Sequence, residues 1–325
     1  MDNEQHGKRW TRREALIGGA AVVSAASLLT GCANRPDTSA LRKRADAVPE
    51  TDPALVQYRE IGRMEPGIEE PTGIAVTADG PVWFVGKDRM VLYRDDGPGE
   101  SQPLPGRASC VAVHGDRLFV GIGSSVYVRS GDGPLAQWLD LGERSVVTCI
   151  TPTADQVLIA DSGERRIVRC AADGRTLGYL CEKDASRGYT GLVVPSPHLD
   201  VVVGADHAIH VVNPGTHTIE VYDPDGNPRY TWGDSSQAME GFCGCCNPTD
   251  IALLEDGRYV TSEKGIPRVK VYSALGHFEA VVTGPEGLSA GAVGLDVAGL
   301  PDGRIAVLDP GIGAVRIFER KGDHA

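Results

Sequence analysis

The sequence predicts an all-β domain, because most of it is a succession of short apolar strands separated by turns, without any sustained helical period. A pattern of three strands, with a turn that often contains Asp-Gly and a loop rich in Gly and Asp, recurs six times. The 41 glycines and 21 prolines suit a chain with so many turns. Small sheets that repeat every 40 to 50 residues or so are typical of a β-propeller.

Six copies of this pattern follow one another, and a further strand precedes them. Their first strands begin near equivalent positions, which are Gly73, Cys110, Cys149, Asp200, Asp250 and Gly294. The sixth copy ends close to the C-terminus and leaves no room for a fourth strand, whereas residues 55–61 form a spare apolar strand. We expect this N-terminal strand to complete the last blade, because closing the ring removes its open edge. The sequence therefore predicts one six-bladed β-propeller over residues 54–321.

The first 31 residues are typical of an export signal. A basic stretch at 8–13 precedes an apolar run at 15–29, which is shorter than the roughly 20 residues of a transmembrane helix. Arg12 and Arg13 resemble a twin-arginine signal, and the residues Leu-Thr-Gly-Cys that end at Cys32 resemble a lipobox. We expect signal removal after residue 31, a lipid on Cys32 and a flexible tether over 32–53. The domain then lies at the periplasmic face of the membrane. A single-span anchor is the alternative.

The charge of the chain limits its partners. Its formal net charge is −12, and an acidic protein repels phosphate backbones. Nucleic acid is therefore not an expected partner. The expected partners are the membrane, through the lipid on Cys32, and a membrane-associated redox protein or another protein.

Residues 241–248, Gly-Phe-Cys-Gly-Cys-Cys-Asn-Pro, hold three of the eight cysteines within four positions. Thiolates are soft metal ligands and redox nucleophiles, so this cluster points to chemistry. In a propeller, the connections between blades share a face with the loops between second and third strands. This places the cysteine cluster near the axis, together with Cys110 and Cys149, which begin inner strands. His217 lies in a loop of the same face. We expect a cysteine-lined mouth there.

Three interpretations of these thiols remain open. The first is a metal centre, zinc or an iron–sulfur cluster, held by ligands from the set Cys243, Cys245, Cys246, Cys110, Cys149 and His217. The tight Cys-x-Cys-Cys spacing argues against it, and the lack of Cys-x2-Cys-His excludes covalent c-type haem. The second is structural disulfides, which form outside the cytoplasm, with Cys110–Cys149 and Cys170–Cys181 as conceivable pairs beside one bridge from the cluster. The third is a catalytic or redox-active thiol.

Other polar residues are expected to face the same mouth, namely Asn213, Asp200, Asp250, Glu263, Lys264 and Arg268. Asp200 and Asp250 start equivalent inner strands, where they either bind a cation, act as a general base or cap backbone donors in the preceding turn. Glu263, Lys264 and Arg268 form either a substrate clamp or an ion-paired loop. The two cations would lower the pKa of a thiol that lies near them.

The blade pattern, as in Pro71-Thr72-Gly73-Ile74-Ala75-Val76 and on to Tyr93, resembles the NHL-repeat family of six-bladed propellers. Four further segments are similar to a subset of exported bacterial NHL-repeat proteins, and these are residues 194–197, 212–217, 241–248 and 261–268. The resemblance implies a specialised site on the face that carries these segments. It implies no established activity.

The function that we expect is a binding or cofactor-carrying module, whose cysteine-lined mouth holds a metal centre or docks a membrane-associated redox partner. A metal-dependent hydrolase or lyase, of the propeller lactonase or lyase type, is the first alternative. A protein-interaction scaffold with structural disulfides is the second. Fold alone cannot choose among them, because propellers host many unrelated functions.

Overall fold

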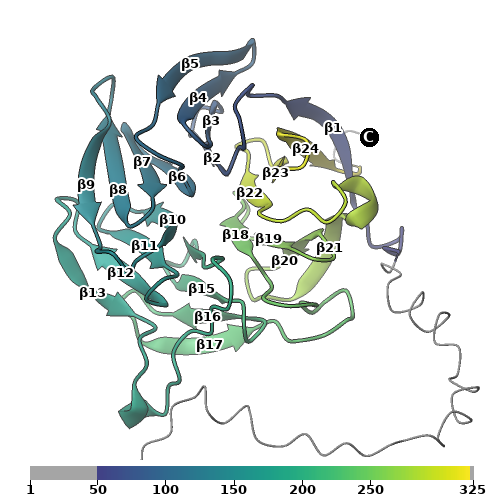
Figure 1. Cartoon of the computed structure of the whole chain (residues 1–325). Helices are drawn as coiled ribbons and strands as arrows, with labels where there is room; N and C mark the ends of the chain where they lie inside the picture. The colour runs from purple at the N-terminus through teal and green to yellow at the C-terminus, as the bar shows by residue number, and fades with distance from the viewer. Residues whose placement is uncertain (1–49, 323–325) are drawn as a thin grey trace, which may run out of the picture. The chain divides into compact units, whose positions relative to one another are not determined.

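Six four-stranded antiparallel sheets surround a central axis in the computed structural model, which describes residues 50–322 (Figure 1). The signal segment, Cys32 and the tether up to residue 49 lie outside the described residues. Thr51 is already buried, and its hydroxyl donates to Glu286 Oε2 at 3.3 Å, so contacts with the propeller begin slightly before residue 54. No helix within residues 50–322 is both long enough and apolar enough to cross a membrane. The predicted six-bladed β-propeller is confirmed.

Each sheet runs in chain order from the axis outward, apart from the last. Blade one contains β2 (Gly73–Val76), β3 (Val82–Val85), β4 (Arg89–Arg94) and β5 (Gly97–Pro103). Blade two contains β6 (Cys110–His114), β7 (Arg117–Ile122), β8 (Ser125–Ser130) and β9 (Ala136–Asp140). Blade three contains β10 (Val147–Pro152), β11 (Val157–Asp161), β12 (Arg166–Cys170) and β13 (Thr176–Leu180).

Blades four and five carry the longest connections. They contain β14 (Val201–Val203), β15 (Ile209–Asn213), β16 (Thr218–Tyr222) and β17 (Pro228–Trp232), followed by β18 (Asp250–Leu253), β19 (Tyr259–Glu263), β20 (Arg268–Tyr272) and β21 (Phe278–Thr283). Short 3-10 helices occur at η2 (Ala185–Arg187) and η3 (Pro285–Gly287). Blade six contains β22 (Asp296–Gly299), β23 (Ile305–Asp309) and β24 (Ala314–Arg320).

The N-terminal strand closes the ring as predicted. Strand β1 (Tyr58–Met64) pairs antiparallel with β24, from Tyr58 opposite Arg320 to Met64 opposite Val315, and becomes the outer strand of blade six. It begins three residues later than the apolar run in the sequence suggests. The predicted starts of the inner strands agree with the structure to within two residues, the largest differences being at β10 and β22.

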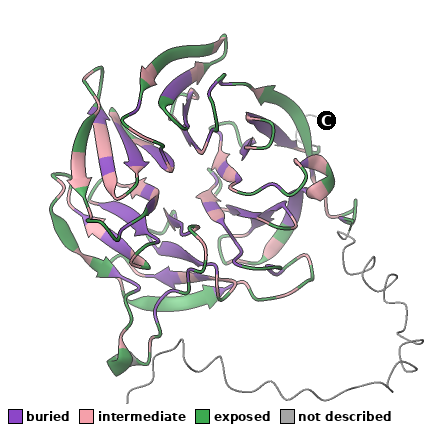
Figure 2. Cartoon of the chain, in the orientation of Figure 1, coloured by how far each residue is buried: buried purple, intermediate pink, exposed green. Residues whose placement is uncertain are grey.

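The hydrophobic core lies between neighbouring blades. Second strands such as β11, β15 and β23 are buried along their whole length, whereas the outer strands β5 and β17 are mostly exposed (Figure 2). A fully buried residue such as Phe84 contributes about 1.5–3 kcal/mol to stability relative to an exposed one. Tight turns reverse the chain within the blades, and Gly257 and Gly303 of two Asp-Gly turns have φ values of 85° and 81°.

Candidate functional site

All six blade junctions contribute to a cavity of about 430 Å³ at the axis. Its wall includes the residues that lead into each inner strand, among them Thr72, Ser109, Val146, Leu199, Thr249 and Leu295. Pro310, from the loop between the second and third strands of blade six, lines the cavity as well. The two kinds of loop therefore share a face, as the sequence predicts.

Three aspartates of this cavity connect successive blades. Asp200, Asp250 and Asp296 stand at or next to the start of the inner strands of blades four, five and six. In each case the Oδ2 atom accepts a hydrogen bond from a backbone N–H of the next blade around the ring. The donors are Ile251 at 2.7 Å, Val297 at 2.6 Å and Ile74 at 2.7 Å, in that order. The backbone donors thus lie across the blade seam and not in the preceding turn.

The three carboxyl groups are electrostatically coupled. Burial raises the pKa of Asp200 and of Asp296 well above the usual range, and the neighbouring Asp250 raises both further through its charge and a hydrogen bond. Asp250 is therefore the common neighbour of the two aspartates whose pKa is raised. The sequence pattern does not indicate Asp296, because it sets the start of the sixth repeat at Gly294, two residues earlier. Shifting that repeat places an aspartate at the same position in three consecutive blades.

Cys110 and Cys149 line the cavity as neutral thiols. Burial raises the pKa of Cys110 to about 12. Burial also raises the pKa of Cys149 well above its usual value, and the adjacent Asp200 adds to the effect. His198, which the sequence-based candidates lack, faces the same cavity, and its pKa is lowered to about 4 by burial and by the charge of Lys264.

The cysteine loop, residues 241–248, is anchored on blade five. Phe242 is fully buried and packs its ring 5.6 Å from that of Tyr272, measured between centroids. The side chain of Asn247 donates to the carbonyls of Cys243 at 2.5 Å and Lys264 at 3.0 Å, and its Oδ1 accepts from Lys264 N at 2.9 Å. Gly241 leaves no space for a side chain, since a Cβ there would lie 2.5 Å from that of Ser236.

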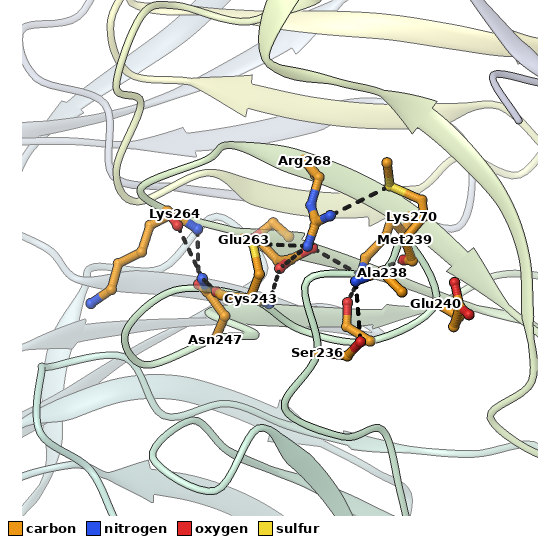
Figure 3. Close-up of polar contacts among 12 residues, drawn as sticks. Ser236, Ala238, Met239, Glu240, Cys243, Asn247, Glu263, Lys264, Arg268 and Lys270 are labelled. Carbon is orange, nitrogen blue, oxygen red and sulfur yellow. Dashed lines mark hydrogen bonds and ion pairs between the residues drawn. The ribbon is translucent and has the colours of Figure 1, made fainter. Parts of the chain in front are cut away.

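A buried charge network lies under this loop (Figure 3). Glu263 at the end of β19 is fully buried and contacts two cations from β20: its Oε2 lies 2.7 Å from Arg268 Nη2 and its Oε1 lies 2.8 Å from Lys270 Nζ. Glu263 Oε2 also accepts from Cys243 N at 3.0 Å, while Arg268 Nη2 lies 3.1 Å from Cys243 Sγ. Lys270 Nζ donates to the carbonyls of Met239 and Gly241.

The network contains two cationic side chains and one carboxylate. Burial lowers the pKa of Lys270 to about 8, against the opposing effect of Glu263. Burial raises the pKa of Cys243, and the charge of Arg268 opposes this. The sequence places Glu263 and Arg268 on the ligand face, whereas the structure buries both beneath the loop. Lys270, in the middle of a strand, carries no sequence signal that distinguishes it from an exposed lysine.

Lys264 connects the cysteine loop to the rim of the cavity. Its backbone is held by Asn247 of the cysteine loop, and its ammonium donates to Ser196 Oγ at 2.6 Å, two residues before His198. Its charge adds to the effect of burial in lowering the pKa of His198. Three of the four segments that the sequence singles out, residues 194–197, 241–248 and 261–268, thus meet at this residue.

Cys245 and Cys246 present two sulfur atoms side by side. Their Sγ atoms lie 3.0 Å apart, Cys245 is exposed and Cys246 is buried. The neighbouring sulfur of Cys246 raises the pKa of Cys245, and Lys264 acts in the opposite direction. All seven cysteines within residues 50–322 are free thiols.

The predicted metal ligands do not come together. Cys110 and Cys149 line the cavity, whereas Cys243, Cys245 and Cys246 lie in the loop beside it. His217 lies in the turn between β15 and β16, and its buried Nδ1 atom has no hydrogen-bond partner. Among residues 50–322, no three His, Cys, Asp or Glu side chains are arranged to hold a metal ion.

Asn213 is fixed within blade four and does not line the cavity. Its Oδ1 accepts from Val193 N at 3.0 Å, and its Nδ2 donates to Glu220 Oε1 at 2.7 Å. This pairing ties the connection before β14 to strand β16, so Asn213 orders the loop that leads to Ser196 and His198.

Comparison with solved structures places the chain among β-propellers of several functions. A streptogramin B lyase superposes with a TM-score of 0.59 at 13% identity, covering 81% of this chain and 98% of the lyase. A virginiamycin B lyase from Staphylococcus aureus gives 0.57 at 13% identity, covering 80% and 99%. A regucalcin from Agrobacterium tumefaciens, a calcium-binding protein, gives 0.59 at 14% identity, covering 80% and 94%. No family model and no curated protein matches the chain.

The class of protein that these findings define is the six-bladed β-propeller. At such low sequence identity, the likeness extends to the fold and not to the site.

Proposed function

We propose that this protein is an exported, membrane-tethered β-propeller that acts as a binding or cofactor-carrying module through its cysteine-rich face. The observation that carries the proposal is the sulfur pair of the exposed Cys245 and the buried Cys246 on an anchored loop, which Lys264 joins to the rim of the axial cavity. The bound species is thiophilic, either a soft metal ion or a redox-active group of a partner protein. Arg12, Arg13 and Cys32 support export and lipid anchoring.

The charge network beneath the loop supports a functional interpretation. Burying an ion pair gives little net stability, because desolvation offsets the attraction between the charges. Glu263, Arg268 and Lys270 are all nearly or fully buried, yet they hold the backbone of Cys243 and Gly241 in one place. A loop with no role other than to connect two blades does not need such fixation.

Metal analysis, with an optical spectrum and a free-thiol count, tests this proposal. The sample is the mature chain with Cys32→Ala, purified without oxygen. A stoichiometric metal that is lost in Cys245→Ser or Cys246→Ser, but kept in the buried control Cys170→Ser, supports a cysteine-ligated centre. No metal and at most one free thiol would mean that the cysteines are structural disulfides, and would overturn the proposal in favour of a scaffold.

A second candidate function is a metal-dependent hydrolase or lyase in the axial cavity. It is favoured by Asp200 and Asp296, whose pKa values are raised by burial and by the neighbouring Asp250, because carboxyl groups with a perturbed pKa in a cavity are typical of general acids and bases. Two of the similar structures have lyase names. If this candidate is right, Asp250→Asn abolishes the turnover of lactone and ester substrates in the presence of added Ca²⁺, while Cys245→Ser leaves it unchanged. Equal activity in the two variants contradicts it.

A further inference from the structure

The two adjacent thiols of the cysteine loop differ in accessibility. Cys245 is exposed, whereas Cys246 has only 4% of its surface exposed, and their sulfur atoms lie 3.0 Å apart. Within residues 50–322, this is the one pair of cysteine sulfurs in direct contact. An accessible thiol can attack a disulfide of another molecule, and a shielded second thiol beside it can resolve the mixed disulfide that forms.

We propose that Cys245 and Cys246 form a dithiol–disulfide couple that exchanges with paired cysteines of a partner protein. This inference rests on the proposed function of the cysteine-rich face, and it names the chemical class of the partner. Cys245 is the sulfur that meets the partner. Cys246 is the resolving sulfur.

The loop holds Cys245 and Cys246 close together, both as two thiols and as a disulfide. Asn247, the next residue, bonds to Cys243 on one side and to Lys264 on the other, and Glu263 holds the N–H of Cys243. The backbone on both sides of the pair is therefore fixed to blade five. Because Cys246 does not have to move far to reach Cys245, a mixed disulfide on Cys245 is resolved within the molecule.

The exchange is balanced as follows. The thiolate of Cys245 attacks one sulfur of the partner's disulfide, a mixed disulfide forms, and the second partner sulfur leaves as a thiolate. The thiolate of Cys246 then attacks the sulfur of Cys245, which forms the Cys245–Cys246 disulfide and expels the first partner sulfur as a thiolate. Two electrons pass from the pair to the partner, and the two protons of Cys245 and Cys246 end on the partner's thiols.

Adjacency of the two cysteines favours the reverse direction. Cα atoms of neighbouring residues lie about 3.8 Å apart, whereas disulfides usually join Cα atoms about 4.4–6.8 Å apart. A disulfide between Cys245 and Cys246 is therefore strained, and strained disulfides are readily reduced. The oxidised pair passes its disulfide to a dithiol of the partner, and a more oxidising protein disulfide restores it.

Oxidation by glutathione disulfide tests the proposal. The mature chain with Cys32→Ala is incubated without oxygen in defined ratios of oxidised and reduced glutathione, then alkylated and mapped by mass spectrometry. The wild-type loop should lose two thiols together and gain no glutathione. In Cys246→Ser, glutathione should accumulate on Cys245, about 10-fold more than in the parent, because the resolving thiol is missing. Cys170→Ser serves as the control and should match the parent.

Two results would overturn the inference. One is the absence of a Cys245–Cys246 disulfide at every glutathione ratio. The other is an equal level of glutathione on Cys245 in the parent and in Cys246→Ser. If a stoichiometric metal bound by the pair accompanies either result, the exchange proposal fails while the proposed function stands. If neither metal nor exchange depends on Cys245, both fail.

Discussion

Single residues at the axis determine how the blades are joined. Asp200, Asp250 and Asp296 each accept a backbone hydrogen bond across a seam, and burial raises the pKa of the first and the last well above the usual value. A group whose pKa is raised on folding stabilises the protein fully below its unfolded pKa, and this contribution is lost as the pH rises through the folded pKa. The seams therefore weaken toward alkaline pH.

Substitution of Asp200 tests this pH dependence. Asp200→Asn keeps an acceptor for the N–H of Ile251 and removes the titration, so its free energy of unfolding should improve relative to wild type as the pH rises above the usual pKa of an aspartate. Asp200→Ala leaves buried N–H groups without an acceptor and should cost about 1–3 kcal/mol. Urea unfolding at several pH values measures both. A constant difference between Asp200→Asn and wild type would contradict the argument.

The sequence predicts the position of some site residues at the axis but not the burial or the grouping of others. It placed Cys110, Cys149, Asp200 and Asp250 at the axis, because the repeat puts the start of every inner strand there. It did not separate the cavity thiols from the loop thiols, since residues from different blades share no spacing. It also could not show that Glu263 and Arg268 are buried, because burial of a charge depends on partners from other segments.

At the scale of elements, the N-terminal strand is the least local part of the fold. Strand β1 lies at the opposite end of the chain from β22, β23 and β24, the other strands of its blade. The sequence predicts its position only because the last repeat lacks a fourth strand. The structure pairs it with β24 and buries Tyr58. Blade number and closure were predictable because each repeat must pair with its neighbours, whereas the bounds of β1 depend on side chains that come from blade six.

Deletion of residues 54–62 should unfold the ring. It removes most of β1, so β24 loses its partner and the core of blade six opens to water. Circular dichroism and thermal melting of the deletion variant measure the loss of β-structure and of the cooperative transition. The matched control is Ile61→Ala, because Ile61 belongs to β1 but is 42% exposed. A soluble deletion variant with an unchanged melt would refute the role of β1.

At the scale of the whole molecule, the predicted export signal can be tested independently of the fold. We predict that replacing Arg12 and Arg13 with Lys abolishes export, because a twin-arginine route reads the pair itself and not its charge. Cell fractionation with an antibody to the propeller measures the outcome. Cys32→Ala should instead be exported and released from the membrane fraction. Normal export of the double-lysine variant would contradict the assignment of the signal.

Because β1 closes the ring, ring closure comes after synthesis of the last strand. Tyr58 pairs with Arg320, so β1, the first strand to be synthesised, cannot pair until β24, the last strand, has been made. Synthesis of the chain between these two strands takes on the order of tens of seconds. Until then the ring has an unpaired edge on either side of its gap. In a truncated chain that lacks β24, strand β1 has no partner, and the open ring is accessible to proteases. The ring is therefore closed only in a chain that contains both β1 and β24.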